Sequence, residues 1–195
     1  MAAASRIAIF GGTFDPVHEG HLHLATLAKR ALSLDQVRFL PCRISPHKAA
    51  TRPASAEDRL EMLRRATADL PWAGVDDFEI GLTTGPSYSY ITAETMARRF
   101  PVARLFWIMG GDQWDSLPRW KNPERLAACV EFIVLARGET PQPRAGCRLH
   151  MVRGQHPASA SAIRTAIASG LGTPPWLPSG VAEWIEKRRL YQAES

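Results

Sequence analysis

Two histidines and a glycine pair near the N-terminus have the types and the spacing needed to bind phosphate. Gly11-Gly12 lets the backbone approach a ligand closely, and His18 and His21 follow at the start of a predicted helix. At this spacing the two rings lie on roughly one face and can direct ring N–H groups at an anion. The helix N-terminus adds unpaired N–H groups and a partial positive charge. We therefore predict a polyphosphate site.

The same residues have simpler interpretations when they are taken singly. A glycine pair after a strand is usually only a turn, and two histidines at this spacing also occur on surfaces or as half of a metal site. The H-E-x-x-H arrangement of zinc hydrolases is absent, which weakens the metal interpretation.

The flanking residues predict the elements that position this site. Ile7 to Phe10 form an apolar run of strand length, which the glycine pair ends. After His21, apolar residues recur at positions 24, 27, 28 and 31, the spacing of a helix with one buried face. A strand, a glycine turn and a helix in this order are typical of the first half of a βαβ unit.

The whole stretch, Gly11-Gly-Thr-Phe-Asp-Pro-Val-His-Glu-Gly-His21, resembles the first signature of the nucleotidyltransferase superfamily. Within that superfamily it is most similar to the bacterial nicotinate-nucleotide adenylyltransferases. The resemblance implies that AMP is transferred from ATP to nicotinate mononucleotide, giving nicotinate adenine dinucleotide and pyrophosphate, a step of NAD biosynthesis. It also implies ATP contacts within this stretch from Gly11, Gly12, Thr13, Phe14, His18 and His21.

A second block, Ser159-Ala-Ser-Ala-Ile-Arg164, places small hydroxyl residues at a predicted helix start and an arginine one turn later. Taken alone, this pattern is typical of a helix cap and a solvated arginine. It resembles the second family signature, where Ala160 replaces a serine found in many relatives. The resemblance implies a triphosphate site made by Ser159, Ser161, Ile163 and Arg164.

Lys48 lies in a proline-rich loop between residues 41 and 54, where a lysine is ordinarily exposed to solvent. Its context, Pro46-His47-Lys48, resembles a family segment. The resemblance implies that the ammonium group acts as a point charge at the reacting phosphates. It further implies that Thr13 and Lys48 contact the acceptor substrate.

The segment Gly85-Pro-Ser-Tyr88 resembles the part of the family that holds the pyridine nucleotide, and this implies acceptor contacts from Ser87 and Tyr88. Two departures weaken the match. Residues 82–84 are Leu-Thr-Thr where relatives carry a basic residue, and the stretch after Tyr88 is slightly longer than usual. The sequence leaves open whether Ser89 or Thr92 faces the acceptor.

A further block, Gly110-Gly-Asp112 followed by Leu117-Pro-Arg-Trp120, also resembles the family. The resemblance implies that Gly110 and Asp112 contact ATP, with Asp112 accepting from a ribose hydroxyl. It implies that Trp120 stacks on the pyridine ring and that a backbone N–H near Lys121 meets the nicotinate carboxylate. Trp120 as a core or hinge aromatic is the alternative.

Two other residues have interpretations of their own. Trp107, inside an apolar run, is expected in the core. Arg137 is placed near the nucleotide by the resemblance, and the alternative is an exposed arginine.

The implied reaction needs no catalytic base, because a phosphate monoester is already a nucleophile at neutral pH. The protein must align the attacking and leaving groups and neutralise charge at phosphorus. The resemblance assigns Mg²⁺ to this work, held mainly by the ATP phosphates, together with the catalytic residues His18, His21, Lys48 and Arg164.

Strand and helix patterns alternate along the chain. Strands are expected at residues 7–10, 37–40, 75–80, 104–109, 132–135 and 149–152, and the closing helices at 159–169 and 179–190. We predict a doubly wound, Rossmann-like α/β fold with helices on both faces of a parallel sheet of about five to six strands in the order 3-2-1-4-5. The ligand crevice then lies between the strands that end at Gly11-Gly12 and Gly110-Gly111.

The chain of 195 residues is expected to form one nucleotidyltransferase domain, on which a helical segment from 159 to 191 packs. Hydrophobic residues make up 45 % and charged residues 22 %, as in soluble globular proteins. The net charge of +5 suits anionic ligands, but the basic residues are scattered, so no nucleic acid partner is expected. The three cysteines have neither disulfide nor zinc spacing.

No signal-peptide core and no apolar run long enough to span a membrane is present, so a cytoplasmic location and no membrane partner are expected. The sequence does not decide between a monomer and a homo-oligomer. Two alternative functions stay open. One keeps the chemistry but uses nicotinamide mononucleotide or phosphopantetheine as the acceptor. The other is a non-catalytic nucleotide sensor or RNA-binding protein, against which the retained His18, His21, Lys48 and Arg164 argue.

Overall fold

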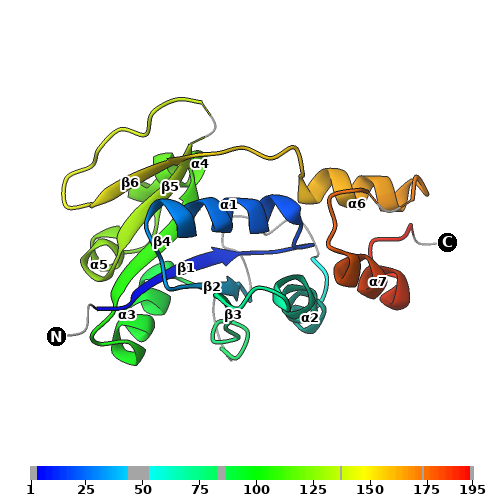
Figure 1. Ribbon diagram of the computed structural model, residues 1–195, viewed down its shortest axis with the longest axis horizontal. Helices are drawn as coiled ribbons and strands as arrows, with labels where there is room; N and C mark the ends of the chain where they lie inside the picture. The colour runs from blue at the N-terminus through cyan, green and yellow to red at the C-terminus, as the bar shows by residue number, and fades with distance from the viewer. Residues whose placement is uncertain (1–3, 44–52, 83–86, 137, 173, 194–195) are drawn as a thin grey trace.

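The computed structural model describes residues 4–43, 53–82, 87–136, 138–172 and 174–193. In this part of the chain one parallel sheet runs in the order β3-β2-β1-β4-β5-β6 (Figure 1). Its strands are β1 (Arg6–Gly12), β2 (Gln36–Pro41), β3 (Ala73–Val75), β4 (Arg104–Gly110), β5 (Glu131–Ala136) and β6 (Leu149–Arg153). The predicted order of the first five strands is confirmed, and β6 adds an edge next to β5.

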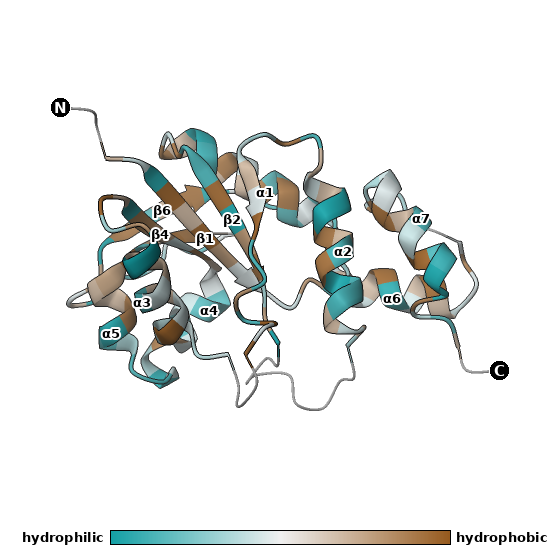
Figure 2. Cartoon of the chain, turned by 90° about the horizontal axis from the view of Figure 1, so that it is seen from below, coloured by the Kyte–Doolittle hydropathy of each residue, from teal (hydrophilic) through white to brown (hydrophobic). Residues whose placement is uncertain are grey.

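Helices cover both faces of this sheet, as the sequence predicts. They are α1 (Glu19–Ala31), α2 (Ala56–Thr67), α3 (Ser89–Arg99), α4 (Gly111–Ser116), the 3-10 helix η1 (Leu117–Arg119), α5 (Pro123–Cys129), α6 (Ala160–Ala168) and α7 (Ser179–Arg188). Figure 2 shows the sheet between α1 on one side and α3, α4 and α5 on the other. This is the doubly wound arrangement.

Alternate side chains of the central strand β1 point to the two faces of the sheet. Ala8 and Phe10 pack in the core that α1 and α2 cover, whereas Ile7 and Ile9 pack in the core beneath α3, α4 and α5. All four are buried. A strand buried on both faces needs a continuous apolar run, and this explains why residues 7–10 show no alternation with polar residues.

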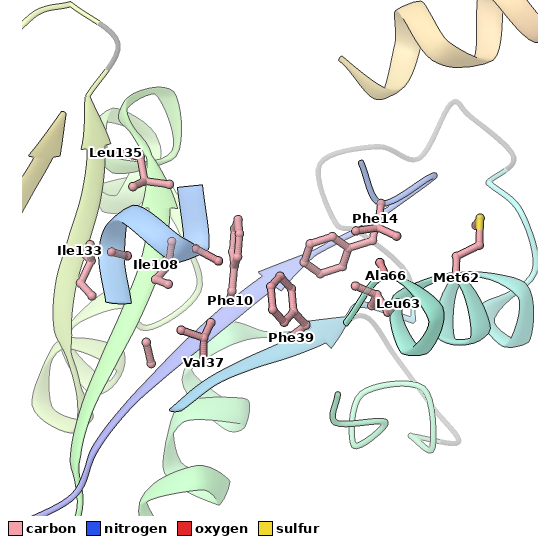
Figure 3. Packing of buried hydrophobic residues seen from close by; sticks show 14 of the residues in the cluster. Phe10, Phe14, Val37, Phe39, Met62, Leu63, Ala66, Ile108, Ile133 and Leu135 are labelled. Atoms are coloured by element: carbon pink, nitrogen blue, oxygen red, sulfur yellow. The ribbon is translucent and has the colours of Figure 1, made fainter. Parts of the chain in front are cut away.

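A row of aromatic rings connects the sheet to α2. Phe10 of β1 lies 5.6 Å from Phe39 of β2 and 5.6 Å from Phe14, measured between ring centroids. Figure 3 shows Phe14 beyond Phe39, on the side nearest Leu63 and Ala66 of α2. The row fixes the turn that follows β1, because Phe14 is 2 % exposed and belongs to the same core cluster.

The C-terminal helix α7 packs against α2, where Val181 and Ile185 are buried in the core on the α1 side (Figure 2). Buried Asp58, in the first turn of α2, accepts hydrogen bonds from Trp184 Nε1 and Arg188 Nε, each at 3.1 Å. Apolar burial and a charged anchor therefore both hold α7 in place.

The prediction of a strand over residues 75–80 is wrong. The strand β3 is shorter and lies earlier, ending at Val75. Next to it the carboxylate of Asp76 accepts from the backbone N–H of Phe78 at 3.0 Å, which closes a tight turn. Asp76 is also held by Arg38 at 2.9 Å. The buried carboxylate therefore turns the chain away from the sheet, although the apolar residues that follow resemble a strand.

Two further expectations concern the whole chain. Cys42, Cys129 and Cys147 are free thiols, as their spacing predicts. Among the described residues, no helix combines the length and the apolar character that crossing a bilayer requires.

Candidate active site

A cavity of about 930 Å³ lies at the carboxyl ends of β1 and β4. The glycine pairs Gly11-Gly12 and Gly110-Gly111 both line it, as the predicted strand order requires. Its walls also include predicted site residues from separate segments of the chain, namely Thr13, Phe14, His21, Ser87, Ser89, Asp112, Trp120 and Arg164. The fold thus brings to one place residues that are up to 153 positions apart, from Gly11 to Arg164.

Aromatic rings lie against the two glycines that end β1. A Cβ atom on Gly12 would lie 3.0 Å from the ring of Phe14, and one on Gly11 would lie 3.3 Å from the ring of Trp107. Trp107 is 4 % exposed, as expected for a core residue, but its ring edge also lines the cavity. A side chain on Gly12 would therefore press against the buried ring of Phe14.

His21 is oriented by a hydrogen bond within the first turn of α1. The backbone N–H of His18 donates to Nδ1 of His21 at 3.2 Å. Because Nδ1 accepts, the proton of the neutral ring is on Nε2. The ring also packs edge-on against Phe14, with the centroids 5.1 Å apart. His21 therefore presents a fixed tautomer in a fixed orientation.

His18 has a different position from His21. Its ring stacks on that of His21 with the centroids 3.8 Å apart, and the residue is 7 % exposed. The cavity lining includes His21 but not His18. The structure thus places His18 behind His21, where it supports the ring.

Arg164 of α6 reaches back to the turn after β1. Its Nη1 donates to the backbone carbonyl of Asp15 at 2.6 Å and lies 3.6 Å from the Asp15 carboxylate. Both residues line the cavity. The second signature is thereby held against the first.

A buried guanidinium joins the ends of β1 and β2. Arg59 of α2 is 1 % exposed, and its Nη1 donates to the carbonyls of Thr13 at 2.9 Å and Cys42 at 2.7 Å. Its Nε donates to the carbonyl of Ala54 at 3.2 Å. Three chain segments around the cavity therefore share one donor group, and the buried polar carbonyls are satisfied.

On the α3 side of the cavity, a buried carboxyl group organises the polar side chains. Glu79 lines the cavity, is 4 % exposed and accepts from Thr92 Oγ1 at 2.6 Å. Burial raises the pKa of Glu79, while hydrogen bonds from Thr92 and Ser87 act against this rise. Ser87 Oγ in turn accepts from the backbone N–H of Arg43 at 3.2 Å.

Trp120 lines the cavity with part of its surface accessible. Its Nε1 donates to Ser116 Oγ at 3.1 Å, which restricts rotation of the ring. Asp112, in the first turn of α4, is exposed at the cavity wall. A flat aromatic surface and a carboxylate are thus available beside the glycine pair of β4.

Comparison with known proteins identifies the family to which a chain with this cavity belongs. The family model for cytidylyltransferase-like proteins matches residues 9–166. A protein of Methylacidiphilum infernorum named "Probable nicotinate-nucleotide adenylyltransferase" is 36 % identical over 188 residues, covering 95 % of this chain and 92 % of that protein. One with the same name from Geobacillus thermodenitrificans is 37 % identical over 194 residues, covering 97 % and 88 %.

The chain belongs to the nicotinate-nucleotide adenylyltransferase family. It is accordingly an enzyme of the nucleotidyltransferase class. Solved structures show that the fold is shared as well. Nicotinic acid mononucleotide adenylyltransferase from Plasmodium falciparum, complexed with NaAD, superposes with a TM-score of 0.77 at 15 % identity, over 96 % of this chain and 97 % of that one. A putative nicotinate-nucleotide adenylyltransferase from Vibrio parahaemolyticus gives 0.69 at 17 % identity, covering 97 % of each chain.

Some residues predicted from the family resemblance do not line the cavity of this family member. The side chain of Ile163 is fully buried in the core on the α1 side, so the predicted contact of Ile163 with ATP would have to come from its backbone. Ser159 and Ser161 do not line the cavity, and their hydroxyl groups bond to each other at 2.8 Å. Ala160, where many relatives have a serine, does line it.

Burial distinguishes the two residues between which the sequence leaves the choice open. Ser89 lines the cavity, whereas Thr92 is 1 % exposed and engaged with Glu79. Of these two residues, Ser89 is the one whose position favours contact with a ligand. Tyr88 and Lys121 are not part of the cavity wall, and Lys121 Nζ lies 5.9 Å from the centroid of the Tyr88 ring. Lys48 and Arg137 lie outside the described residues.

Sequence reasoning missed Asp15, Arg59 and Glu79, whose side chains are all buried at this site. Asp15 stands inside the first signature, directly after Phe14, which the resemblance assigns to the ATP site. Arg59 directly precedes Leu60 on the buried face of α2, and Glu79 stands between apolar Phe78 and Ile80. A charged residue within an apolar pattern is the signal that could have identified the last two.

The residues of the cavity fit a metal ion that binds together with the nucleotide better than one that is held by protein side chains alone. Among the described residues, no group of three His, Cys, Asp or Glu side chains is placed to hold a metal ion. The Asp15 carboxylate is engaged by Tyr191 at 2.7 Å, and Glu79 is buried with a raised pKa. A cation at this site would therefore be held mainly by phosphate oxygens.

Proposed function

We propose that this protein transfers AMP from ATP to nicotinate mononucleotide, producing nicotinate adenine dinucleotide and pyrophosphate. One observation carries the proposal. A single cavity is lined both by phosphate-binding features, the β1 glycines with His21 and Arg164, and by the flat surface of Trp120. Its volume of about 930 Å³ is near the upper end of the range for small-molecule sites, about 300–1,000 Å³, which suits two nucleotides together. Family membership supports the same reaction.

The reaction we propose is an in-line displacement at the α-phosphorus of ATP. An oxygen of the acceptor phosphate forms a bond to this phosphorus, the bond to the bridging β-phosphate oxygen breaks, and pyrophosphate leaves with the electron pair. The acceptor monoester is largely ionised at pH 7, because the second pKa of such a phosphate is about 6. No side chain needs to remove a proton, so alignment and charge neutralisation are the tasks of the protein.

We assign the phosphate contacts to residues around the first glycine pair. Gly11 and Gly12 end β1, and Thr13 and Phe14 follow directly. We propose that the backbone N–H groups of this segment approach the triphosphate and that Nε2–H of His21 donates to it. Arg164 adds a charged planar donor. His18 acts through His21, on which its ring stacks. Lys48 is proposed for the same phosphates on the family resemblance alone.

We assign the pyridine ring of the acceptor to Trp120. The bond from its Nε1 to Ser116 supports a ring that is oriented before the ligand arrives. Ser87 and Ser89 are proposed as polar contacts of the acceptor, and the backbone N–H near Lys121 as a donor to its carboxylate. Asp112 is proposed to accept from a ribose hydroxyl, and Arg137 to lie near the nucleotide.

We further infer that Mg²⁺ enters with ATP, and that residues 1–195 act as one nucleotidyltransferase domain. The ion, when bound, offsets negative charge on the phosphate oxygens. The protein side chains then orient the phosphates and complete the neutralisation. This division of work agrees with the hydrogen bonds that occupy two buried carboxyl groups of the cavity, Asp15 with Tyr191 and Glu79 with Thr92.

Pyrophosphate release tests the proposal when three acceptors are compared under equal conditions with ATP and Mg²⁺: nicotinate mononucleotide, its amide and phosphopantetheine. We expect strong preference for the acid. Equal use of acid and amide would retain the reaction and remove the carboxylate contact near Lys121. Pyrophosphate release with phosphopantetheine alone would show that phosphopantetheine, and not nicotinate mononucleotide, is the acceptor. No pyrophosphate release with any of the three acceptors would contradict the proposed function.

A further inference from the structure

The carboxylate of Asp15 is a junction between four distant parts of the chain. Its Oδ1 accepts from the backbone N–H of Ala54 at 3.0 Å and from the hydroxyl of Tyr191 at 2.7 Å. Its Oδ2 lies 3.6 Å from Nη1 of Arg164, and the same nitrogen donates to the Asp15 carbonyl at 2.6 Å. Asp15 is 8 % exposed and lines the cavity.

The backbone on both sides of this junction is strained. Phe14, directly before Asp15, has φ = 50°, and Tyr191 has φ = 63°. Positive φ is disfavoured for bulky residues, and such conformations persist only where the surrounding structure enforces them. Phe14 is held by its aromatic neighbours. The hydroxyl of Tyr191 donates a hydrogen bond to Asp15.

The charges at the junction are complementary. Burial and the neighbouring Asp15 carboxylate raise the pKa of Tyr191, so its hydroxyl keeps the proton that it donates. The carboxylate then has two neutral donors on one oxygen and the Arg164 guanidinium beside the other. A charge-assisted contact of this kind restricts the guanidinium, which is only about one-third exposed.

We propose that Asp15 is a positioning residue for Arg164 and that Tyr191, through Asp15, makes the C-terminal end of the chain part of the phosphate site. This inference rests on the proposed function for the identity of the anion that Arg164 meets. Tyr191 does not line the cavity, so its hydroxyl acts on a ligand through Asp15, which contacts Arg164. The end of the chain is then more than packing for α7, because it sets the direction of a cavity side chain.

A double-mutant cycle tests this coupling, with Tyr191→Phe and Arg164→Ala made singly and together. Tyr191→Phe removes one hydroxyl and retains the ring. We expect it to lower kcat/KM for ATP about tenfold in the wild-type background, as loss of a hydrogen bond to a charged group does. In the Arg164→Ala background the same change should have less than about a twofold effect, since the group it positions is gone.

Tyr90→Phe is the matched control, because Tyr90 stacks on Arg125 and is not part of the cavity wall. It should leave kcat/KM unchanged. An equal loss from Tyr191→Phe in both backgrounds would overturn the proposal, since a purely structural hydroxyl acts independently of Arg164. So would an equal loss from Tyr90→Phe.

The wild-type protein, the two single variants and the double variant should also be titrated with MgATP by calorimetry. Binding measured in this way separates this inference from the proposed reaction. If wild-type protein binds ATP but forms no dinucleotide, the proposed function fails and the binding cycle still decides the coupling. Non-additive losses of affinity would support the positioning role. Additive losses, or absence of ATP binding by the wild-type protein, would overturn it.

Discussion

The backbone N–H of His18 donates to Nδ1 of His21, and the two rings stack with their centroids 3.8 Å apart. This relationship gives the two histidines of one motif separate tasks. His21 lines the cavity, and the hydrogen bond from the backbone of His18 fixes its tautomer. The two histidines resemble equivalent phosphate ligands in the sequence, but of the pair His21 alone lines the cavity. We therefore propose His21 as the donor and His18 as its support.

Replacing His21 by alanine should lower kcat far more than ATP affinity. Loss of one oriented donor to a developing charge costs about 100-fold in kcat, whereas the ground-state triphosphate retains its other contacts. Steady-state kinetics together with ATP titration measures both quantities. His23→Ala, which removes an exposed imidazole from the same helix, should change neither. Parallel losses of kcat and affinity from His21→Ala would instead indicate uniform binding.

Replacing Arg59 by methionine should destabilise the protein by about 3 kcal/mol or more, because buried carbonyl groups of three segments lose their donor. Urea unfolding measures this change. Arg64→Met, on the exposed side of the same helix, should stay within about 0.5 kcal/mol of wild type. If both variants unfold at the same urea concentration, the buried guanidinium does not hold the segments together.

Replacing Trp120 by alanine should raise KM for nicotinate mononucleotide about tenfold or more, with KM for ATP unchanged. Stacking of a base on an aromatic ring contributes about 1–3 kcal/mol. Trp120→Phe keeps an aromatic face and loses the bond to Ser116, so it should show only part of the effect. An increase in KM for ATP of the same size would place Trp120 at the other nucleotide.

Glu131 is the first residue of β5, at the ends of the strands opposite the cavity. It makes the free energy of unfolding depend on pH in the acid range. The Arg104 guanidinium, bonded at 2.6 Å, lowers the pKa of Glu131 to about 2, with a further contribution from His150. A carboxyl with a lowered pKa stabilises the fold fully above its ordinary pKa of 4.5, and this contribution is lost as the pH falls towards about 2.

Glu131→Gln should therefore cost about 2 kcal/mol in the free energy of unfolding at pH 7, a figure reduced for the exposure of Arg104, and progressively less between pH 5 and pH 2. Unfolding curves across this pH range for both proteins provide the measurement. Glu183→Gln, at an exposed position of α7, is the control. A difference that stays constant with pH would exclude the ion pair as its source.

The parts of the fold that the sequence predicts are those that local patterns determine. The apolar run before Gly11, the helical spacing after His21 and the apolar run from Arg104 each act within about a dozen residues, and parallel α/β topology then restricts the strand order. The same reasoning wrongly predicts a strand over residues 75–80, because Asp76 closes a turn through its own side chain. The helix α4, with six residues, is too short to show a period.

The features of the site that the sequence does not predict depend on contacts between residues far apart in the chain. Arg59 serves carbonyls on three segments, and Tyr191 reaches a carboxylate 176 positions earlier in the chain. No spacing rule connects such pairs. The choice between Ser89 and Thr92 is similar, since it depends on which hydroxyl the buried Glu79 engages.

The most direct test of the central claim follows oxygen from the acceptor into the product. Nicotinate mononucleotide carrying a heavy-oxygen label on its phosphate is incubated with ATP, Mg²⁺ and the protein, and the products are analysed by mass spectrometry. In-line attack on the α-phosphorus predicts nicotinate adenine dinucleotide that retains every labelled oxygen, together with unlabelled pyrophosphate. Label in the pyrophosphate, or ATP consumed without dinucleotide, would contradict the account.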